Sequence, residues 1–551
     1  MDSITSKWMN IIDANCEYLG IQKVQLMENA GASVAQEIKG AYRKHRKEIP
    51  HPSDDAKYNI VLFAGTGNNG GDAFVAARHL AVLHAFSVSV ILLGQDSDIK
   101  TNEARSNFMV LDTDSITVIR ITDSSMLASL SDMIKSADCI VDAMLGTGIK
   151  GKVREPVSTA IDMINSSSAF KIAVDVPSGC DGDTGKYDKT VFADTTITFH
   201  RMKPGIMDAK CAGTVKVVPI GIPYSAFRYV GLGDLMMLGA RNPTGHKGHN
   251  GRILIIGGGA YTGAPVLAAL GALRAGADIV TVATPASVSR EVQAMSANII
   301  VKSLSGERLC DDDIPLLEPL IKEHDCVVIG MGLGKGCDSV VSKIVWMCDR
   351  VVIDADAITR EVIASLQNQK CKADVIITPH AGEFRRLANL SEELKSRCID
   401  VSGFCAQGVG ANANSNGNGV DCGNGVNCGN GVNCGNGHDT DQDNNYNNDI
   451  NSNYKNKNKN IVTLLKGRID IISDGIMTRL NSTGNAGMTV GGTGDVLAGI
   501  AGALFAHQDA FDAACLAAFI NGRAGDVAYD KYNTGLVATD IIEEIAGAMI
   551  I

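Results

Sequence analysis

The stretch with the clearest chemical signal is NAGMTVGGTGDVLAGIAGALFA, residues 485–506, in which Asp495 follows a glycine turn and precedes an apolar segment. Glycines allow the backbone to approach a ligand closely, and the segment from Val496 onward has the length and composition of a buried helix. The first N–H groups of such a helix favour a phosphate or another anion. Asp495 fits a base that takes a proton from the group attacking a phosphate, or alternatively a residue that simply caps the helix.

A second set of polar residues belongs to the N-terminal half. The stretch GTGNNGGD (65–72) lies between an expected strand and an expected helix and satisfies the GxGxxG pattern. Its asparagines and aspartate add groups that phosphate cradling alone does not require. Other polar residues follow further strands, and the carboxyl ends of strands form the ligand crevice of an open α/β sheet, so one active site is predicted there. Several of these oxygen-bearing groups would also suit a hard cation. The set comprises Asn68, Asn69, Asp72, Asp142, Asp175, Ser178 and Lys203.

The elements that must position these residues form two series of apolar strands, each strand followed by a helical segment. This alternation predicts parallel sheets covered on both faces. The composition changes over 221–251, which predicts a boundary near residue 228 and domains at 1–228 and 229–551. The first series has strands at 59–65, 87–94, 139–146, 171–179 and 195–200. The second has strands at 251–259, 277–284, 326–334, 350–357, 374–383 and 460–467.

A low-complexity segment at 401–459 interrupts the second series. It is rich in Asn, Gly, Asp and Ser, and it repeats Cys422, Cys428 and Cys434 with a period of six. Such a segment cannot bury enough apolar surface to offset its ordering entropy, so we expect a disordered insert on the surface of the second domain. The cysteines could bind a metal, but they form no CxxC pair, and expansion of a coding repeat is the preferred explanation.

Composition and charge exclude several classes of function. The length of 551 residues suits two to four domains, and the hydrophobic content of 45% is ample for packed cores. The formal net charge of -11 argues against a nucleic-acid-binding surface. The N-terminus lacks the apolar core of a signal peptide, and no apolar run reaches the length of a membrane span. We therefore expect a cytoplasmic protein with no nucleic-acid or membrane partner.

Taken together, the motifs resemble two known families. The N-terminal half, over about residues 1–225, resembles the NAD(P)H-hydrate epimerase domain through GTGNNGGD, DAMLGTGIKG, VDVPSGCDGDTG and MKPG. The remainder, without the insert, resembles the ADP-dependent NAD(P)H-hydrate dehydratase through HKGHNGRILIIGGGAYTGAP, MGLGKG, VIDADA, TPHAGE, LLKG and NAGMTVGGTGDVLAG. The resemblance implies a Rossmann-like three-layer sandwich followed by a ribokinase-like α/β sandwich, fused in a bifunctional nicotinamide-nucleotide repair enzyme.

For the first domain, the resemblance implies epimerisation of the R and S hydrates of NADH and NADPH (NADHX and NADPHX). Asp175 would be catalytic, because epimerisation at a carbon bearing a hydroxyl group needs an acid or base near the ring. The resemblance also implies a K⁺ ion held by Asn69, Asp142 and Ser178. The implied substrate-binding residues are Asn68, Asn69, Gly70, Gly71, Asp72, Gly146, Thr147, Gly148, Ile149, Lys150, Gly151, Lys152 and Asp175.

For the second domain, the resemblance implies that ADP phosphorylates the ring hydroxyl of the S hydrate and that loss of phosphate restores the cofactor. Asp495 would be the catalytic base, with glycine N–H groups as the anion hole and Mg²⁺ on the nucleotide phosphates. Nothing in the stretch LLKGRIDII distinguishes ADP from ATP. The implied substrate-binding residues are Ala264, Gly332, His380 and Asp495. The implied nucleotide-binding residues are Lys466, Gly467, Arg468, Ile469, Asp470 and Gly494.

Some alternatives stay open at this point. His380 could be a structural histidine and Lys466 a solvated lysine, although both follow apolar strands at the ligand edge of the sheet. The second half could phosphorylate a small alcohol, because a fold does not determine its substrate. The first half could be a non-catalytic nucleotide-binding or scaffolding module, against which the presence of Asp175, Asn69 and Asp142 argues. We also expect a homo-oligomer.

Overall fold

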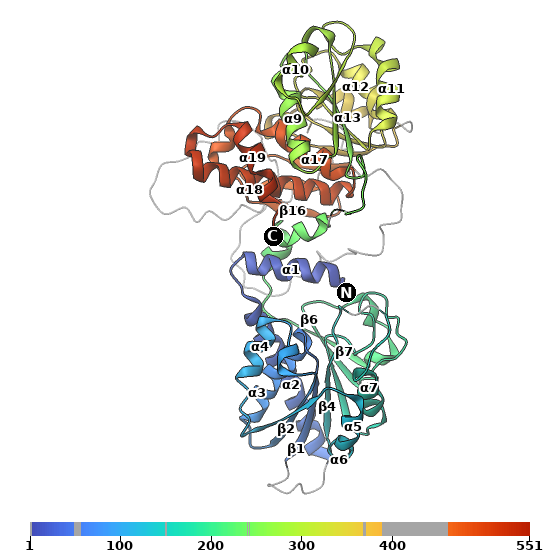
Figure 1. Cartoon of the computed structure of the whole chain (residues 1–551), viewed down its shortest axis with the longest axis vertical. Coiled ribbons are helices and arrows are strands. Elements are labelled where there is room, and N and C mark those ends of the chain that lie inside the picture. Colours follow the sequence, from blue (N-terminus) through green and yellow to red (C-terminus); the bar gives the residue numbers. More distant parts are fainter. Residues whose placement is uncertain are drawn as a thin grey trace, which may run out of the picture.

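A computed structural model describes residues 3–48, 57–148, 151–239, 241, 243–366, 371–387 and 461–551. In this part of the chain two α/β domains follow one another along the long axis, each with a sheet between helices (Figure 1). The predicted insert at 401–459 lies outside the described residues.

The first sheet has the strand order β3-β2-β1-β4-β5-β6-β7, and every described neighbour pair is parallel. Alternate side chains of its strands pack to opposite faces, with α2, α3 and α4 on one face and α5, α6 and α7 on the other (Figure 1). The strands are β1 (Tyr58–Ala64), β2 (Phe86–Leu93), β3 (Ile116–Ile121), β4 (Cys139–Ala143), β5 (Phe170–Val174), β6 (Thr195–Phe199) and β7 (Thr214–Val218). The helices are α1 (Ser6–Tyr18), α2 (Lys23–Glu48), α3 (Asn68–Ala81), α4 (Asn102–Met109), α5 (Ser124–Leu127), α6 (Ser131–Lys135), α7 (Val157–Ser166) and α8 (Tyr224–Arg228).

The second sheet has the order β10-β9-β8-β11-β12-β13-β14-β15-β16, parallel up to β14 and antiparallel from β14 to β16. Helices α9, α10, α17, α18 and α19 cover one face, and α11 to α14 cover the other. The strands are β8 (Arg252–Ile256), β9 (Ile279–Thr284), β10 (Ile300–Ser303), β11 (Cys326–Ile329), β12 (Arg350–Ile353), β13 (Asp374–Ile377), β14 (Ile461–Leu465), β15 (Asp470–Ser473) and β16 (Thr478–Asn481). The helices are α9 (Gly263–Arg274), α10 (Ser289–Met295), α11 (Ile314–Glu323), α12 (Asp338–Met347), α13 (Arg360–Ser365), α14 (Ala381–Leu387), α17 (Thr493–Phe505), α18 (Ala510–Tyr532) and α19 (Ala538–Ala548).

The two-domain α/β architecture agrees with the sequence prediction, but the strand series missed the sheet edges. Strands β3, β7 and β10 lie at edges of the sheets, and most of their side chains are exposed or half-buried, so they lack the continuous apolar runs by which central strands were recognised. The hairpin β15–β16 also departs from the wholly parallel expectation, because a four-residue connection suits antiparallel strands only.

Helix α1 lies between the two domains and contributes to both (Figure 1). The side chain of Ile11 packs in the core of the second domain, whereas the adjacent Ile12 packs in the core of the first. Both side chains are fully buried. A helix turns by about 100° per residue, so neighbouring side chains point in different directions and one short helix can join two cores.

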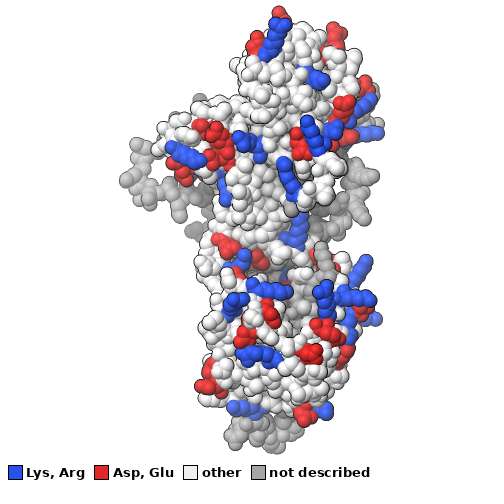
Figure 2. All heavy atoms as spheres, viewed as in Figure 1, with Lys and Arg blue, Asp and Glu red and all other residues white. Residues whose placement is uncertain are grey.

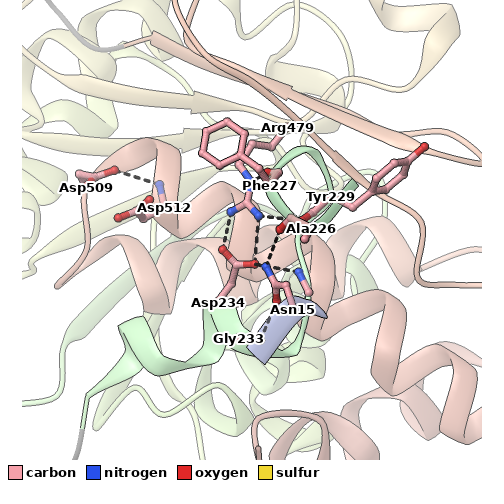
Figure 3. A network of polar contacts seen from close by, with 10 residues as sticks. Asn15, Ala226, Phe227, Tyr229, Gly233, Asp234, Arg479, Asp509 and Asp512 are labelled. Atoms are coloured by element: carbon pink, nitrogen blue, oxygen red, sulfur yellow. Dashed lines mark hydrogen bonds and ion pairs between the residues drawn. The ribbon is translucent and has the colours of Figure 1, made fainter. Parts of the chain in front are cut away.

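A buried polar network fastens this helix to the second domain (Figure 3). The guanidinium of Arg479, on β16, forms an ion pair with Asp234, which lies in the connection between the domains and is fully buried. Arg479 also donates to the carbonyl oxygens of Phe227 at 3.1 Å and Tyr229 at 2.7 Å. The amide of Asn15, on α1, donates to the second carboxylate oxygen of Asp234 at 3.0 Å. The network therefore joins α1, the interdomain connection and β16.

The surface seen in Figure 2 carries Lys and Arg side chains interspersed with Asp and Glu. Among the described residues, no helix combines the length and the apolar character that crossing a membrane requires.

Candidate active sites

The first site is a cavity of about 760 Å³ at the carboxyl ends of β1, β4, β5 and β6. Helices α1 and α2 and the start of α3 form its other walls. This position agrees with the rule that ligands bind outside the carboxyl ends of parallel strands. The predicted substrate-binding residues found in its wall are Asn68, Asn69, Asp72, Gly146, Thr147, Gly148 and Asp175.

Asp175 follows β5 with a left-handed backbone, φ 64°, which is unusual for a residue other than glycine. The ammonium of Lys203 lies 2.6 Å from its Oδ1, and the hydroxyl of Thr198 donates to the same oxygen at 3.1 Å. Lys203 is only 1% exposed and also donates to the carbonyl oxygen of Phe199 at 2.9 Å. This buried lysine therefore holds the Asp175 carboxylate in one orientation at the cavity.

Two further carboxylates, Asp13 and Asp72, lie in the same cavity. Burial raises the pKa of Asp13 to about 7; Lys203 lowers it and Asp175 raises it. Burial also raises the pKa of Asp72 well above its usual value, with further increases from Asp175 and Asp13. Burial and neighbouring carboxylates thus raise the pKa values of both Asp13 and Asp72, so this site can hold a proton near neutral pH.

The three predicted K⁺ ligands lie around the loop that follows β4. Ser178 donates its hydroxyl to Oδ1 of Asp142 and its N–H to Oδ2 at 2.7 Å. The amide of Asn69 donates to the carbonyl oxygens of Leu145 at 3.1 Å and Val174 at 3.0 Å. Burial raises the pKa of Asp142 to about 6, with its hydrogen bonds acting in the opposite direction. The side chains thus gather carboxylate, hydroxyl and carbonyl oxygens, the donor type that hard cations prefer.

The remaining predicted substrate-binding residues of the first domain are not among the described residues that line the cavity. Gly70 and Gly71 are buried in the first turn of α3, next to the cavity. Gly151 and Lys152 are not among the residues that line it. Ile149 and Lys150 lie outside the described residues.

The second site is a cavity of about 610 Å³ between the first turns of α9 and α17. Gly492 is the N-cap of α17 and has φ 98°, a left-handed conformation that glycine adopts without strain. Gly499 allows the two helices to touch, because a Cβ atom there would lie 1.9 Å from the carbonyl oxygen of Ala268. Ala264, Gly332 and Asp495, three of the predicted residues, line this cavity.

Asp495 lies in the first turn of α17 and lines the cavity. Burial raises its pKa to about 7; Asp354 raises it further, Lys466 lowers it and Asp356 raises it. The ammonium of Lys466 lies 2.8 Å from Asp354 Oδ1, which also accepts the hydroxyl of Thr378 at 2.6 Å. Asp354 thus has its own cation, whereas Asp495 is poised to exchange a proton near neutral pH.

Lys466 extends toward the first turn of α17. A Cβ atom placed on Gly494 would lie 3.2 Å from the Lys466 ammonium nitrogen, so the two predicted nucleotide-binding residues are neighbours. The predicted stretch 466–470 forms the turn between β14 and β15, and Asp470 accepts the N–H of Gly467 at 3.0 Å. This stretch includes Arg468 and Ile469, and none of its residues lines the described cavity.

His380 is not among the residues that line the second cavity. It forms an isolated bridge with Lys466 and accepts the N–H of Gly382 on Nδ1 at 2.9 Å. The backbone N–H of His380 donates to Oε2 of Glu383 at 2.9 Å, and its ring Nε2 lies 3.4 Å from Oε1 of Glu383. The ring therefore lies beside the nucleotide turn at the start of α14.

Three site residues were not assigned a role from the sequence. Asp354 and Asp356 belong to the motif VIDADA, so their position after an apolar strand was the available signal. Asp13 had no such signal, because it belongs to no recognised motif and reaches the cavity only through the packing of α1.

Comparison with known proteins agrees with the division into two domains. Residues 23–205 match a family described as YjeF-related protein N-terminus, and residues 253–409 and 437–546 match one described as NAD(P)H-hydrate dehydratase. The bifunctional NAD(P)H-hydrate repair enzyme of Archaeoglobus fulgidus is 40% identical, covering 100% of this chain and 99% of its own. Those of Methanothermobacter thermautotrophicus and Hyperthermus butylicus are 37% and 36% identical, covering 98% and 99% of this chain and 94% and 92% of their own.

Proposed function

The chain belongs to the family of bifunctional NAD(P)H-hydrate repair enzymes, and from this membership we propose that each cavity performs one of the two repair reactions. The first cavity interconverts the R and S hydrates of NADH and NADPH. The second dehydrates the S hydrate at the expense of a nucleotide. Supporting this division, each cavity belongs to a separate α/β domain and contains a carboxylate suited to proton transfer.

In the first cavity, Asp175 acts as acid/base on the hydroxyl-bearing carbon of the ring. Lys203 orients its carboxylate, and the loops at Asn68–Asp72 and Gly146–Gly148 hold the nucleotide. Asp142, Ser178 and Asn69 would hold K⁺, a fit supported by the oxygens that gather at the loop after β4. When bound, that cation would supply positive charge next to the substrate loops.

In the second cavity, Asp495 takes the proton of the ring hydroxyl as that oxygen attacks the terminal phosphoryl group. The phosphorylated oxygen is then a good leaving group, and its departure restores the double bond. The N–H groups after Gly492 point out of the first turn of α17 and stabilise the transferred phosphoryl group. The observation that carries this assignment is the position of Asp495, which lines the cavity from the first turn of that helix, where burial raises its pKa to about 7.

The nucleotide binds at the side of the second site where Lys466 lies, with its phosphates toward Gly494. Lys466 supplies positive charge, and residues 467–470 and His380 border the same region. Asp356 lines the cavity with a carboxylate, the ligand type that Mg²⁺ prefers, and would hold the ion that accompanies the phosphates. Mg²⁺ would there neutralise phosphate charge. ADP is the proposed donor.

The test is recovery of reduced-nicotinamide absorbance from a mixture of R- and S-NADHX with Mg²⁺ and either ADP or ATP. Wild-type protein should restore the whole mixture with one donor, and Asp495→Asn should restore none. Recovery of only the S half would remove epimerisation from the proposal. No recovery with either donor would contradict repair altogether and direct attention to small alcohols as substrates. Cytoplasmic location and homo-oligomerisation stay predictions, and light scattering would test the latter.

A further inference from the structure

One face of α1 lines the first cavity. Ser6, Met9, Asn10 and Asp13 all contribute to the cavity wall. Their spacing of i, i+3, i+4 and i+7 places them on a single stripe of a helix. The neighbouring stripes are buried in the two domain cores and in the network of Arg479, so the helix cannot rotate without breaking those contacts. The Asp13 carboxylate is therefore held in place at the cavity.

The charged groups that face Asp13 come from four other elements of the first domain. Asp175 follows β5, Lys203 follows β6, Asp72 lies on α3 and Lys23 lies on α2. On α1 itself, burial and then the charge of Asp13 raise the pKa of Cys16. Lys203 is already committed to Asp175 at 2.6 Å. Among the described residues Asp13 therefore forms no ion pair with a cation of its own, and it lies in a wall of the cavity different from that of Asp175.

We propose that Asp13 is a second acid/base residue of the epimerase reaction, working with Asp175 on the same substrate carbon. The inference rests on the proposed assignment of epimerisation to the first cavity. This role would link the contact between the domains to catalysis, because the contacts of Ile11 and Asn15 hold the helix that carries Asp13 against the second domain. Burial raises the pKa of Asp13 to about 7, which suits either role at neutral pH.

Inversion of the ring carbon needs one proton given and one proton taken. In the forward step the C–O bond breaks with its electron pair moving to oxygen, the departing hydroxyl takes a proton from one carboxylic acid, and water leaves. The ring nitrogen stabilises the cation with its lone pair. Water then adds to the opposite face, and a carboxylate takes its extra proton. The sum inverts the centre with no net change in protons, and two carboxyl groups in different walls can divide these tasks.

The test follows interconversion of purified R- and S-NADHX by chromatography, without nucleotide, in full-length Asp13→Asn. We expect kcat to fall about 100-fold or more with KM little changed, as for loss of a general acid or base. Dehydration of S-NADHX by the same preparation should stay within about twofold of wild type, which serves as an internal measure of folding. Asp13→Glu, which keeps the carboxyl group, should recover part of the rate.

Asp132→Asn is the control, because Asp132 is a fully exposed carboxylate of the same domain, and neither it nor its partner Lys135 lines the cavity. It should epimerise at the wild-type rate. Wild-type kcat should change with pH near 7, and Asp13→Asn should lose that dependence. Epimerisation by Asp13→Asn within about threefold of wild type, or a loss confined to KM, would overturn the inference. Failure of the wild-type protein to epimerise would instead overturn the proposed function.

Discussion

The two cavities use the same pair of residue types in opposite ways. In the first, Lys203 contacts the candidate acid/base itself, at 2.6 Å from Asp175. In the second, Lys466 pairs with Asp354, and the candidate base Asp495 is left to be protonated near neutral pH. A lysine can thus either orient the reacting carboxylate, as Lys203 does, or pair with a neighbouring carboxylate, as Lys466 does. In the second cavity the lysine pairs with Asp354, and burial raises the pKa of Asp495 to about 7.

The cavities also differ in what holds them together. Among the residues that the structure describes, the second is lined only by residues of its own domain, between Ala260 and Asp495. The first includes α1 and Met236, which lie in or next to the interdomain contact. The first site should therefore depend on the second domain, whereas the second site should be self-sufficient.

The largest effect should come from Asp495→Asn. Removing the base should lower kcat for dehydration of the S hydrate about 1,000-fold, within the range for general bases. Epimerisation should stay at the wild-type rate, because Asp495 belongs to the other domain. The measurement is absorbance recovery from pure S-NADHX, with epimer interconversion as the control. A parallel loss of both reactions would contradict separate sites.

Arg479→Met should have the second largest effect. The free energy of unfolding should fall by about 3 kcal/mol, because Asp234 would remain buried without its cation. Denaturant titration measures this. Adding Asp234→Leu should recover part of the loss, since an apolar pair leaves no buried charge. In the folded single variant, epimerisation should fall more than dehydration. An equal fall in both would remove the distinction between dependent and self-sufficient sites.

The pH dependence of dehydration should be the next effect in size. Asp495 must be ionised to accept a proton, and its raised pKa of about 7 means that it is mostly protonated below that pH. Therefore kcat/KM should rise about tenfold per pH unit up to about 7 and level off above. Asp354→Asn should move the rise to lower pH, because the Asp354 charge raises the pKa of Asp495. A flat profile across the neutral range would contradict Asp495 as the base.

Arg120→Met should have the smallest effect and serves as the counterpart of Arg479→Met. Arg120 forms an ion pair with Asp96 at 2.6 Å, but the side chains are 45% and 51% exposed. Water already solvates both charges, so the free energy of unfolding should fall by less than about 1 kcal/mol in the same denaturant titration. A loss as large as that of Arg479→Met would show that burial does not determine the strength of these pairs.

The sequence predicts the elements whose signals are local. The central strands appear as apolar runs, and Asn69, Asp175 and Asp495 follow such runs or glycine turns and line the cavities. It does not predict the edge strands, whose side chains are half exposed, or the position of Asp13. That position depends on contacts between residues far apart in the chain, such as Asn15 and Asp234, 219 positions away. No pattern within one segment reports such a contact.

The sharing of α1 also bears on the order of events during synthesis. The first sheet is complete in the chain once β7 has been made, at Val218. Arg479 is made 245 residues after its partner Asp234, and the core that receives Ile11 extends to Ala548. A nascent chain can therefore form the first sheet early. The contacts of its N-terminal helix with the second domain cannot form until the last helices have been synthesised. The first active site encoded is therefore among the last parts of the protein to reach its native structure.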